Sequence, residues 1–398
     1  MAHLLNKGKG HWKAQFSVGF EGGQRKRLSR TFKVDPAKTE TAQRREVEKL
    51  AAAYETDLQR GILTASSRIT IKQLSEEWYE SYVKRNKLSP VTQAHYRLLL
   101  DGRILPRIGS LVVQEVTSRS MNSFITWVEN DVPKSRRAKG EKLSGTTCKK
   151  YHTLLHSLFE FAIRQGYITV NPIAATVSPK KDTPEKPFYT ADQSALLLEA
   201  LDQEPILWRA YFYLALYSQL RRGELVALDW PDIDLDHSII SVSKSAYSLP
   251  GGGVMLKEPK STSGRRLVTI PASVCALLEE LKADHRLQRL RSLGKWQDTG
   301  AVFTQSNGQR IHPDSPAGRL KKIVTRYKLP PISPHGLRHT GASLLIASGE
   351  DYKTIQHRLG HSRASTTLDI YAHHLDHRDA EASSKLDSIL ETARKIAK

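Results

Sequence analysis

HGLRHT at His335–Thr340 and LGHS at Leu359–Ser362 stand in the last third of the chain, and both precede Tyr371. Well upstream, LRRGEL occupies Leu220–Leu225. Two arginines, two histidines and a tyrosine in this order are the groups needed to hold a phosphodiester and to attack it with a phenol. These stretches constrain the fold and the chemistry more tightly than any other part of the sequence.

Attack on a phosphodiester spreads negative charge over its non-bridging oxygens, so catalysis needs fixed cations with planar donors, and arginine supplies both. We therefore predict that Arg221 and Arg338 hold the phosphate. A nucleophile and a proton donor for the leaving 5′ oxygen are also needed. Tyr371 is the candidate nucleophile, and His335 and His361 are candidate donors or proton carriers.

Lys260 is a further candidate, because it lies in the polar stretch Lys257–Arg265, which the pattern predicts to be the tip of a hairpin. A flexible ammonium there could reach the leaving oxygen as a general acid. A zinc site is the alternative use of His335 and His339, but the glycine between them replaces a metalloprotease glutamate and Arg338 would repel a cation. We predict neither a metal nor a cofactor.

The charge balance points to a polyanionic partner. Lys and Arg number 61 against 41 Asp and Glu, a net charge of +20 over 398 residues. Nucleic acid is the favoured partner, and no apolar run approaches the roughly 18 residues of a membrane span. Cys148 and Cys275 are too far apart for a CxxC zinc pattern, and a disulfide framework is not expected. With no signal peptide at the start, the chain is predicted to be reduced and cytosolic.

Residues 1–65 are predicted to form a small separate domain. Apolar residues alternate from Trp12 to Phe20, as in a half-buried strand, and Arg27 to Val34 is a second strand before a helix. A small sheet with basic strands fits a DNA-binding module, although a solvated basic edge explains the same charges. The candidate DNA contacts here are Lys13, Arg25, Lys26, Arg27 and Arg30.

Residues 66–176 have a helical pattern, with Ser89-Pro90 starting one of the helices. A basic loop between two of these helices supplies further candidate DNA contacts, Lys134, Arg136 and Arg137, for which a solvated loop is the equal alternative. Residues 177–187 are predicted to be a linker, because they are rich in proline and lysine. Residues 188–398 show a mixed pattern of helices and short strands, with an amphipathic tail after Tyr371.

These motifs, together with Lys260-Ser261 and TTLDIYAH at Thr366–His373, resemble the tyrosine recombinase (phage integrase) family, whose motifs occur in the same order. The helical segment resembles that family's core-binding domain with its SAM-like fold. Residues 1–65 resemble the arm-binding module of integrases from phages and conjugative transposons. The fold class so implied is multidomain and mainly α with small β elements: a three-stranded sheet plus helix, a helical core-binding domain and a mixed α/β catalytic domain.

The resemblance implies that Arg221, Lys260, His335, Arg338 and His361 surround the scissile phosphate while Tyr371 forms a 3′-phosphotyrosyl bond. Glu224 matches an acidic position that braces the active-site arginines. The chain departs from the family pattern at Gln219, where glycine is common, and at Ser261, where threonine is common. We expect Gln219 to stiffen or shift the turn that presents Arg221.

The implied partners are double-stranded DNA with core and arm sites, a homotetramer on that DNA, and a directionality factor or a host DNA-bending protein. The implied setting is the nucleoid of a bacterial host. The leading hypothesis is therefore a site-specific integrase of a mobile element. A type IB topoisomerase-like enzyme and a non-catalytic DNA-binding accessory protein remain the alternatives.

Overall fold

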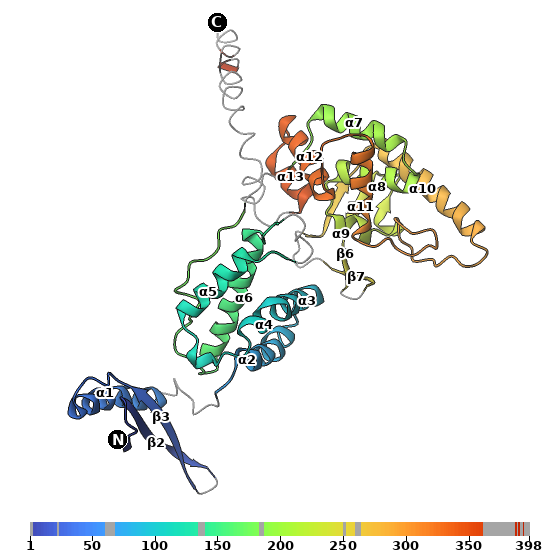
Figure 1. Cartoon of the computed structure of the whole chain (residues 1–398). Coiled ribbons are helices and arrows are strands. Elements are labelled where there is room, and N and C mark those ends of the chain that lie inside the picture. The colour runs from blue at the N-terminus through green and yellow to red at the C-terminus, as the bar shows by residue number, and fades with distance from the viewer. Residues whose placement is uncertain are drawn as a thin grey trace. The chain divides into compact units, whose positions relative to one another are not determined.

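The computed structural model describes residues 3–21, 24–59, 68–133, 140–182, 187–249, 252–258 and 264–360, with 387, 389–390 and 393 in the tail. Contacts within the chain define two compact units, Met1–Thr183 and Pro184–Lys398. Figure 1 shows the elements of each unit. The finer division at residues 65, 176 and 187 stays a prediction. No helix among the described residues is long and apolar enough to cross a membrane.

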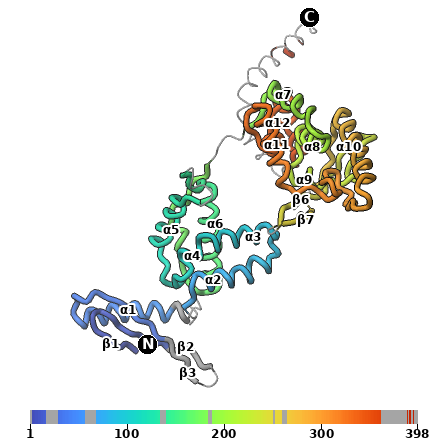
Figure 2. Tube along the Cα trace, turned by 45° about the vertical axis from the view of Figure 1, so that its right-hand side comes forward, coloured from blue at the N-terminus to red at the C-terminus, as the bar shows by residue number. Residues whose placement is uncertain are grey.

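The first unit begins with an antiparallel sheet of order β1-β2-β3, packed against one helix (Figure 2). Trp12, Ala14 and Phe16 point to the helix side of β2, where they are buried against Val47 and Ala51. The three-stranded sheet plus helix expected from the resemblance is thereby confirmed. Its elements are β1 (His3–Asn6), β2 (His11–Glu21), β3 (Gln24–Lys33) and α1 (Glu40–Gln59).

The rest of the first unit is helical and has its own hydrophobic core, centred on residues such as Trp78, Phe124 and Leu155. Ser89 caps the helix that starts at Pro90, as predicted, because its hydroxyl accepts a hydrogen bond from the backbone of Thr92. The α-helices are α2 (Ile71–Trp78), α3 (Pro90–Leu99), α4 (Leu105–Ile108), α5 (Ser118–Asn130) and α6 (Gly145–Arg164). Short π-helical turns, η1 (Tyr79–Lys84) and η2 (Leu100–Ile104), extend α2 and α3.

The second unit combines helices with two small antiparallel sheets, β4-β5-β8 and β6-β7. Its helices are α7 (Ala191–Asp202), α8 (Ile206–Ser218), α9 (Arg222–Ala227), α10 (Ala272–Arg291), α11 (Ser315–Arg326), α12 (Pro334–Ala347) and α13 (Tyr352–Leu359). Its strands are β4 (Ile233–Asp234), β5 (Ile239–Val242), β6 (Ser245–Ser248), β7 (Val254–Lys257) and β8 (Arg266–Thr269).

Helix α8 lies at the centre of this unit. Residues from all around its circumference are buried, including Ala210, Phe212 and Leu214, because α7, α10 and α12 pack on it from different sides. The C-terminal end of α8 therefore meets α12 and the start of α9, the two helices that carry the predicted arginines.

The sequence predicted a hairpin with Lys260 at its tip. This prediction is wrong, because the two strands that flank Lys260, β7 and β8, do not pair with each other. Strand β7 pairs with β6, and β8 pairs with β5 in the other sheet. The physical reason is that the inward side of β8 places Val268 in the core beside β5 and Arg266 on the buried Glu224. The local pattern predicted a hairpin here, but a local pattern cannot select the partners of its strands.

Candidate active site

Arg221 occupies the N-cap of α9. Its backbone N–H donates to the Glu224 carboxylate at 2.8 Å, and its guanidinium donates to the same carboxylate at 2.7 Å. A side chain on Gly223 would lie 2.5 Å from Ser245 Oγ and 2.7 Å from the Ala246 carbonyl oxygen. Glycine thus allows α9 to approach β6 closely, while Arg221 keeps 39% of its side chain exposed.

Glu224 is buried between two arginines. Arg266, with no exposed side-chain surface, donates to its carboxylate at 2.8 Å, opposite Arg221. Burial raises the pKa of Glu224, but the hydrogen bond and charge of Arg266, together with Arg221, outweigh it and hold the pKa below its ordinary value. The carboxylate is therefore ionised near neutral pH and fixes the orientation of both guanidinium groups.

Arg338 lies one turn into α12 and is buried, with 1% of its surface exposed. Ser333 caps the helix through a hydrogen bond from the Gly336 backbone. A side chain on Gly341 would lie 2.3 Å from the Leu216 carbonyl oxygen, so this glycine lets α12 pack onto the end of α8. Arg338 consequently reaches the backbone carbonyl of Gln219, to which it donates at 2.8 Å.

Gln219 ends α8 in the left-handed conformation, with φ of 52° and ψ of 27°. This backbone favours glycine, which explains the usual residue of the family at this position. The Gln219 side chain supports the turn: its amide donates to the carbonyls of Leu216 and Tyr217, and its oxygen accepts from Arg358 at 2.8 Å. These three bonds brace the turn before Arg221, and the expectation that Gln219 stiffens or shifts it stays a prediction.

Three arginines meet at the C-terminal end of α13. Arg266 donates to the carbonyl of residue 358 at 2.8 Å, Arg338 to that of residue 359 at 2.5 Å, and Arg221 to that of Gly360 at 2.9 Å. Helix-end carbonyls lack intrahelical partners and carry partial negative charge, so cations are favoured there. Together with Arg358, which lies in the last turn of α13, these three arginines (Arg221, Arg266 and Arg338) are called the arginine cluster below.

His335 lies in the first turn of α12, on the exposed side, one turn before Arg338. The His339 ring, which is buried, packs edge-on against it with the ring centroids 4.5 Å apart. Within the described parts of the chain, no group of three or more His, Cys, Asp or Glu side chains could hold a metal. Arg221, Glu224, Arg338 and His335 thus come from segments α9 and α12, which both meet the end of α8.

Several predicted residues lie outside the described residues: Lys260, Ser261, His361 and Tyr371, together with Lys134, Arg136 and Arg137. The side chains of Arg25, Lys26 and Arg27 are likewise not described. Lys13 lies on the sheet face opposite α1, because its neighbours Trp12 and Ala14 face that helix. Arg30 lies on the helix side, with its guanidinium 4.4 Å from the centroid of the Tyr54 ring.

Sequence reasoning missed Arg266 and Arg358 as members of the site. Arg222 is half-exposed and pairs with Asp314 at 2.9 Å. One signal could have found Arg266: it occupies an inward position of a short strand whose other inward residue is Val268. A charged residue on the buried side of a strand implies a buried partner.

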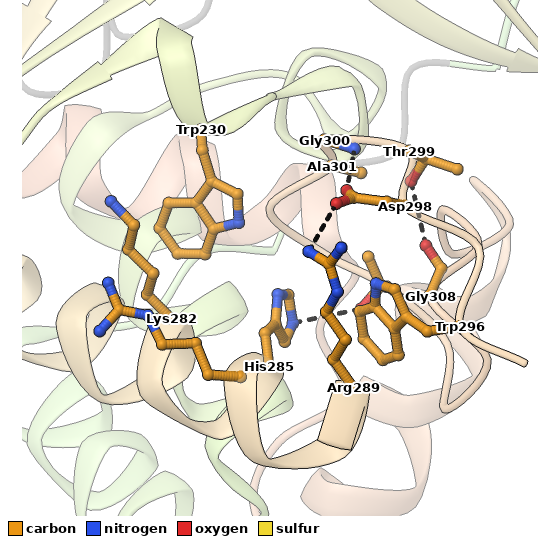
Figure 3. Close-up of a pocket in the computed structure, with 12 residues that line it drawn as sticks. Trp230, Lys282, His285, Arg289, Trp296, Asp298, Thr299, Gly300, Ala301 and Gly308 are labelled. Atoms are coloured by element: carbon orange, nitrogen blue, oxygen red, sulfur yellow. Dashed lines mark hydrogen bonds and ion pairs between the residues drawn. The ribbon is translucent and has the colours of Figure 1, made fainter. Parts of the chain in front are cut away.

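A separate small cavity of about 170 Å³ lies between α10 and the loop that follows it (Figure 3). Trp230, His285 and Trp296 form its aromatic walls. Burial lowers the pKa of His285, whose ring bonds Thr304, and Arg289 pairs with Asp298. The predicted catalytic residues that the structure describes, Arg221, His335 and Arg338, do not line this cavity, and its contacts hold the loop on α10.

The fold has helical and mixed α/β parts, and its arginine cluster fits a site that binds a phosphate group. The model of the phage integrase family matches residues 187–378, and the phage integrase SAM-like domain matches residues 76–180. The ICEBs1 integrase of Bacillus subtilis is 27% identical over 70% of this chain and 72% of its own length. The tyrosine recombinase XerC of Thermodesulfovibrio yellowstonii is 30% identical over 58% of this chain and 72% of its own length.

Among solved structures, the Tn1549 transposon integrase in complex with a circular intermediate DNA has a TM-score of 0.63, covering 76% of this chain and 95% of its own. At 22% identity, this likeness shows a shared fold. The chain belongs to the phage integrase family and is a tyrosine recombinase, an enzyme that breaks and rejoins DNA strands.

Proposed function

We propose that this tyrosine recombinase is a site-specific integrase that inserts and excises a mobile DNA element in the bacterial cytoplasm. The Tyr371 phenol oxygen attacks the scissile phosphorus, forms a 3′-phosphotyrosyl bond and releases the 5′ oxygen, which takes up a proton as 5′-hydroxyl. A 5′-hydroxyl of the partner strand then attacks the phosphotyrosine and frees Tyr371. Because the phosphotyrosine conserves the bond energy, the cycle needs no external energy source.

In this proposal Arg221 and Arg338 bind the non-bridging oxygens, while Lys260, His335 and His361 carry protons. One observation carries this proposal. Arg338 and Arg221 come from distant segments and donate hydrogen bonds to the adjacent carbonyls of Leu359 and Gly360, which immediately precede His361 in the chain. Arg221, which keeps 39% of its side chain exposed, is the planar donor fixed in advance, and such a donor stabilises developing charge without reorganisation. Arg338 is buried, so the phosphate reaches it only after a local rearrangement that accompanies DNA binding.

The two-site character of the proposed integrase rests on the N-terminal module. Its β-sheet leaves one face free of α1, and Lys13 lies on that face. We propose that this face binds arm sites while the helical segment 66–176 binds core sites; linking two binding modules in one chain raises the effective concentration at the second site. A directionality factor or host DNA-bending protein would act on this bridged complex.

A homotetramer on DNA is proposed as the active assembly. An apolar groove of about 680 Å³ is lined by Leu198, Leu344 and Arg358, among others. In the tail, Ile389 and Leu390 keep 64% and 55% of their surface exposed. The tail of one copy filling the groove of the next would cover both apolar surfaces and would contact the arginine cluster through Arg358.

The covalent intermediate is the decisive test. Duplexes that the full chain binds are selected from a random-sequence library, nicked within the bound segment and incubated with wild-type protein or Tyr371→Phe. The nick lets a short strand diffuse away after cleavage and traps the adduct. Wild-type protein should give a detergent-resistant protein–DNA adduct that Tyr371→Phe abolishes; no adduct on any selected duplex would favour a non-catalytic accessory protein.

Strand exchange distinguishes the remaining alternatives. An integrase should resolve synthetic Holliday junctions built from the selected sequence, whereas relaxation of supercoiled plasmid without strand exchange would identify a topoisomerase. Removing residues 380–398 should impair pairing of two DNA sites more than binding of one site. Unchanged pairing would refute the role proposed for the tail.

A further inference from the structure

Arg266 differs from the other arginines of the cluster in its burial. Arg221 keeps 39% of its side chain exposed, whereas the Arg266 side chain has no exposed surface. Its Nη1 and Nη2 donate to Glu224, and Nη1 also lies 3.4 Å from the Gly264 carbonyl. Its Nε donates to the carbonyl of residue 358. Arg266 therefore uses its donors inside the protein and is not placed to contact DNA.

The contacts of Arg266 connect two parts of the proposed site. On one side, Glu224 fixes Arg221 through two hydrogen bonds. On the other side, Arg266 binds the carbonyl of residue 358. The next two carbonyls at the end of α13 accept hydrogen bonds from Arg338 and Arg221. A displacement of α13 would thus move the anchors of both arginines, and Arg266 opposes it from β8.

We propose that Arg266 is a positioning residue for strand cleavage. It locks the C-terminal end of α13 to Glu224, and it thereby sets the spacing between Arg221, Arg338 and the backbone of Gly360. The residue acts through its neighbours and not on the phosphate. This inference rests on the proposed function, because it assigns a role within that same site.

Arg266→Lys and Arg266→Gln test the proposal in the full chain. Lysine keeps the charge but cannot bridge a carboxylate and a carbonyl with a rigid planar fork. The matched control is Arg265→Gln, since Arg265 is the adjacent arginine, is 60% exposed and pairs with the exposed Glu258. The readouts are single-turnover cleavage of the nicked duplex at saturating protein and the Kd for the intact duplex.

Positioning and folding affect different parameters of the cleavage curve. A fraction of misfolded protein lowers the amplitude of the adduct, whereas a displaced site lowers the rate constant of the molecules that react. We expect both Arg266 variants to cleave about ten- to a hundredfold more slowly, the loss that a displacement near 1 Å produces. Their Kd should stay within about twofold of the wild-type value, because Arg266 makes no DNA contact.

Each outcome bears on a different claim. A wild-type rate constant in the Arg266 variants, or a loss of amplitude alone, would overturn the positioning role and leave the integrase proposal intact. Slower cleavage in Arg265→Gln to the same degree would also overturn it, because a general loss of basic charge would then explain the effect. Absence of any adduct from the wild-type chain would instead refute the proposed function.

Discussion

Two buried carboxylates in the second unit are each held by two arginines, yet only one belongs to the candidate site. Glu204, after α7, is bound by Arg319 and by Arg326, the latter at 2.7 Å, both from α11. Glu224 is bound by Arg221 and Arg266. Both pairs fix elements to each other, but the partners of Glu224 also donate to backbone carbonyls at the C-terminal end of α13. The candidate site is therefore distinguished by the further hydrogen bonds of its arginines to α13, and not by the ion pair itself.

The largest expected effect is on the cleavage rate, when the more exposed arginine beside each carboxylate is replaced: Arg221 beside Glu224 and Arg326 beside Glu204. Arg221→Lys should reduce cleavage by a factor on the order of 10²–10³, because lysine loses the planar fork directed at the phosphate. Arg326→Lys, beside Glu204, should leave the rate within about twofold. Single-turnover cleavage measures both, and equal losses would erase the proposed distinction between the two carboxylates.

Removing the charge of each carboxylate comes next. Glu224→Gln leaves Arg266 buried without a counter-charge and should lower the free energy of unfolding by about 3–5 kcal/mol. Glu204→Gln should cost less, since Arg319 and Arg326 are 25% and 56% exposed and can turn to water. Denaturant unfolding gives the free energies. Cleavage per folded molecule should fall only for Glu224→Gln; a matching fall for Glu204→Gln would contradict this assignment.

Two helical glycines extend the same comparison. Gly341→Ala places a carbon 2.3 Å from the Leu216 carbonyl oxygen, so α12 must shift and carry Arg338 with it. We expect a loss of about 1–3 kcal/mol in the free energy of unfolding, together with slower cleavage. Gly318→Ala on α11, where nothing lies within 4 Å, should instead stabilise the helix by up to about 1 kcal/mol. Thermal unfolding with cleavage assays measures both.

Acidification should weaken the Glu224 link selectively. Because Arg266 and Arg221 hold the pKa of Glu224 below its ordinary value near 4.5, ionised Glu224 contributes stability above that pH. The contribution is lost as the pH falls from that value through the lower pKa of the folded state. The stability difference between wild type and Glu224→Gln should therefore be constant near neutral pH and shrink in acid. A difference that is independent of pH would refute the buried ion pair.

The smallest effects are expected in the N-terminal module, where the two faces of the sheet can be compared. Lys13→Ala on the free face should weaken binding to arm-site DNA and reduce the salt slope by about one. Arg30→Ala should mainly remove the contact with Tyr54, a loss of about 0.5–1 kcal/mol in stability. Salt-dependent binding isotherms measure the difference, and an equal salt slope for both variants would reject the face assignment.

Much of the local structure was predictable from residue patterns. Ser89-Pro90 begins α3, and the alternation from Trp12 gives β2. Local interactions suffice for such elements because caps, strand alternation and helix propensity act within a few residues. The pairing of β7 with β6 and of β8 with β5 was not predictable, since strand partners depend on contacts between residues far apart in the chain.

By itself the sequence determined the family, through the order of LRRGEL, HGLRHT and LGHS, and it identified Arg221, Glu224 and Arg338 as the residues to examine. Only the tertiary structure decided how they are held. It showed that Gln219 supports a left-handed turn with its own side chain, and that Arg266, hidden on the inward side of β8, joins Glu224 to the end of α13. The physical reason is that a motif encodes donors and acceptors, whereas their pairing depends on burial and on backbone carbonyls supplied by other elements.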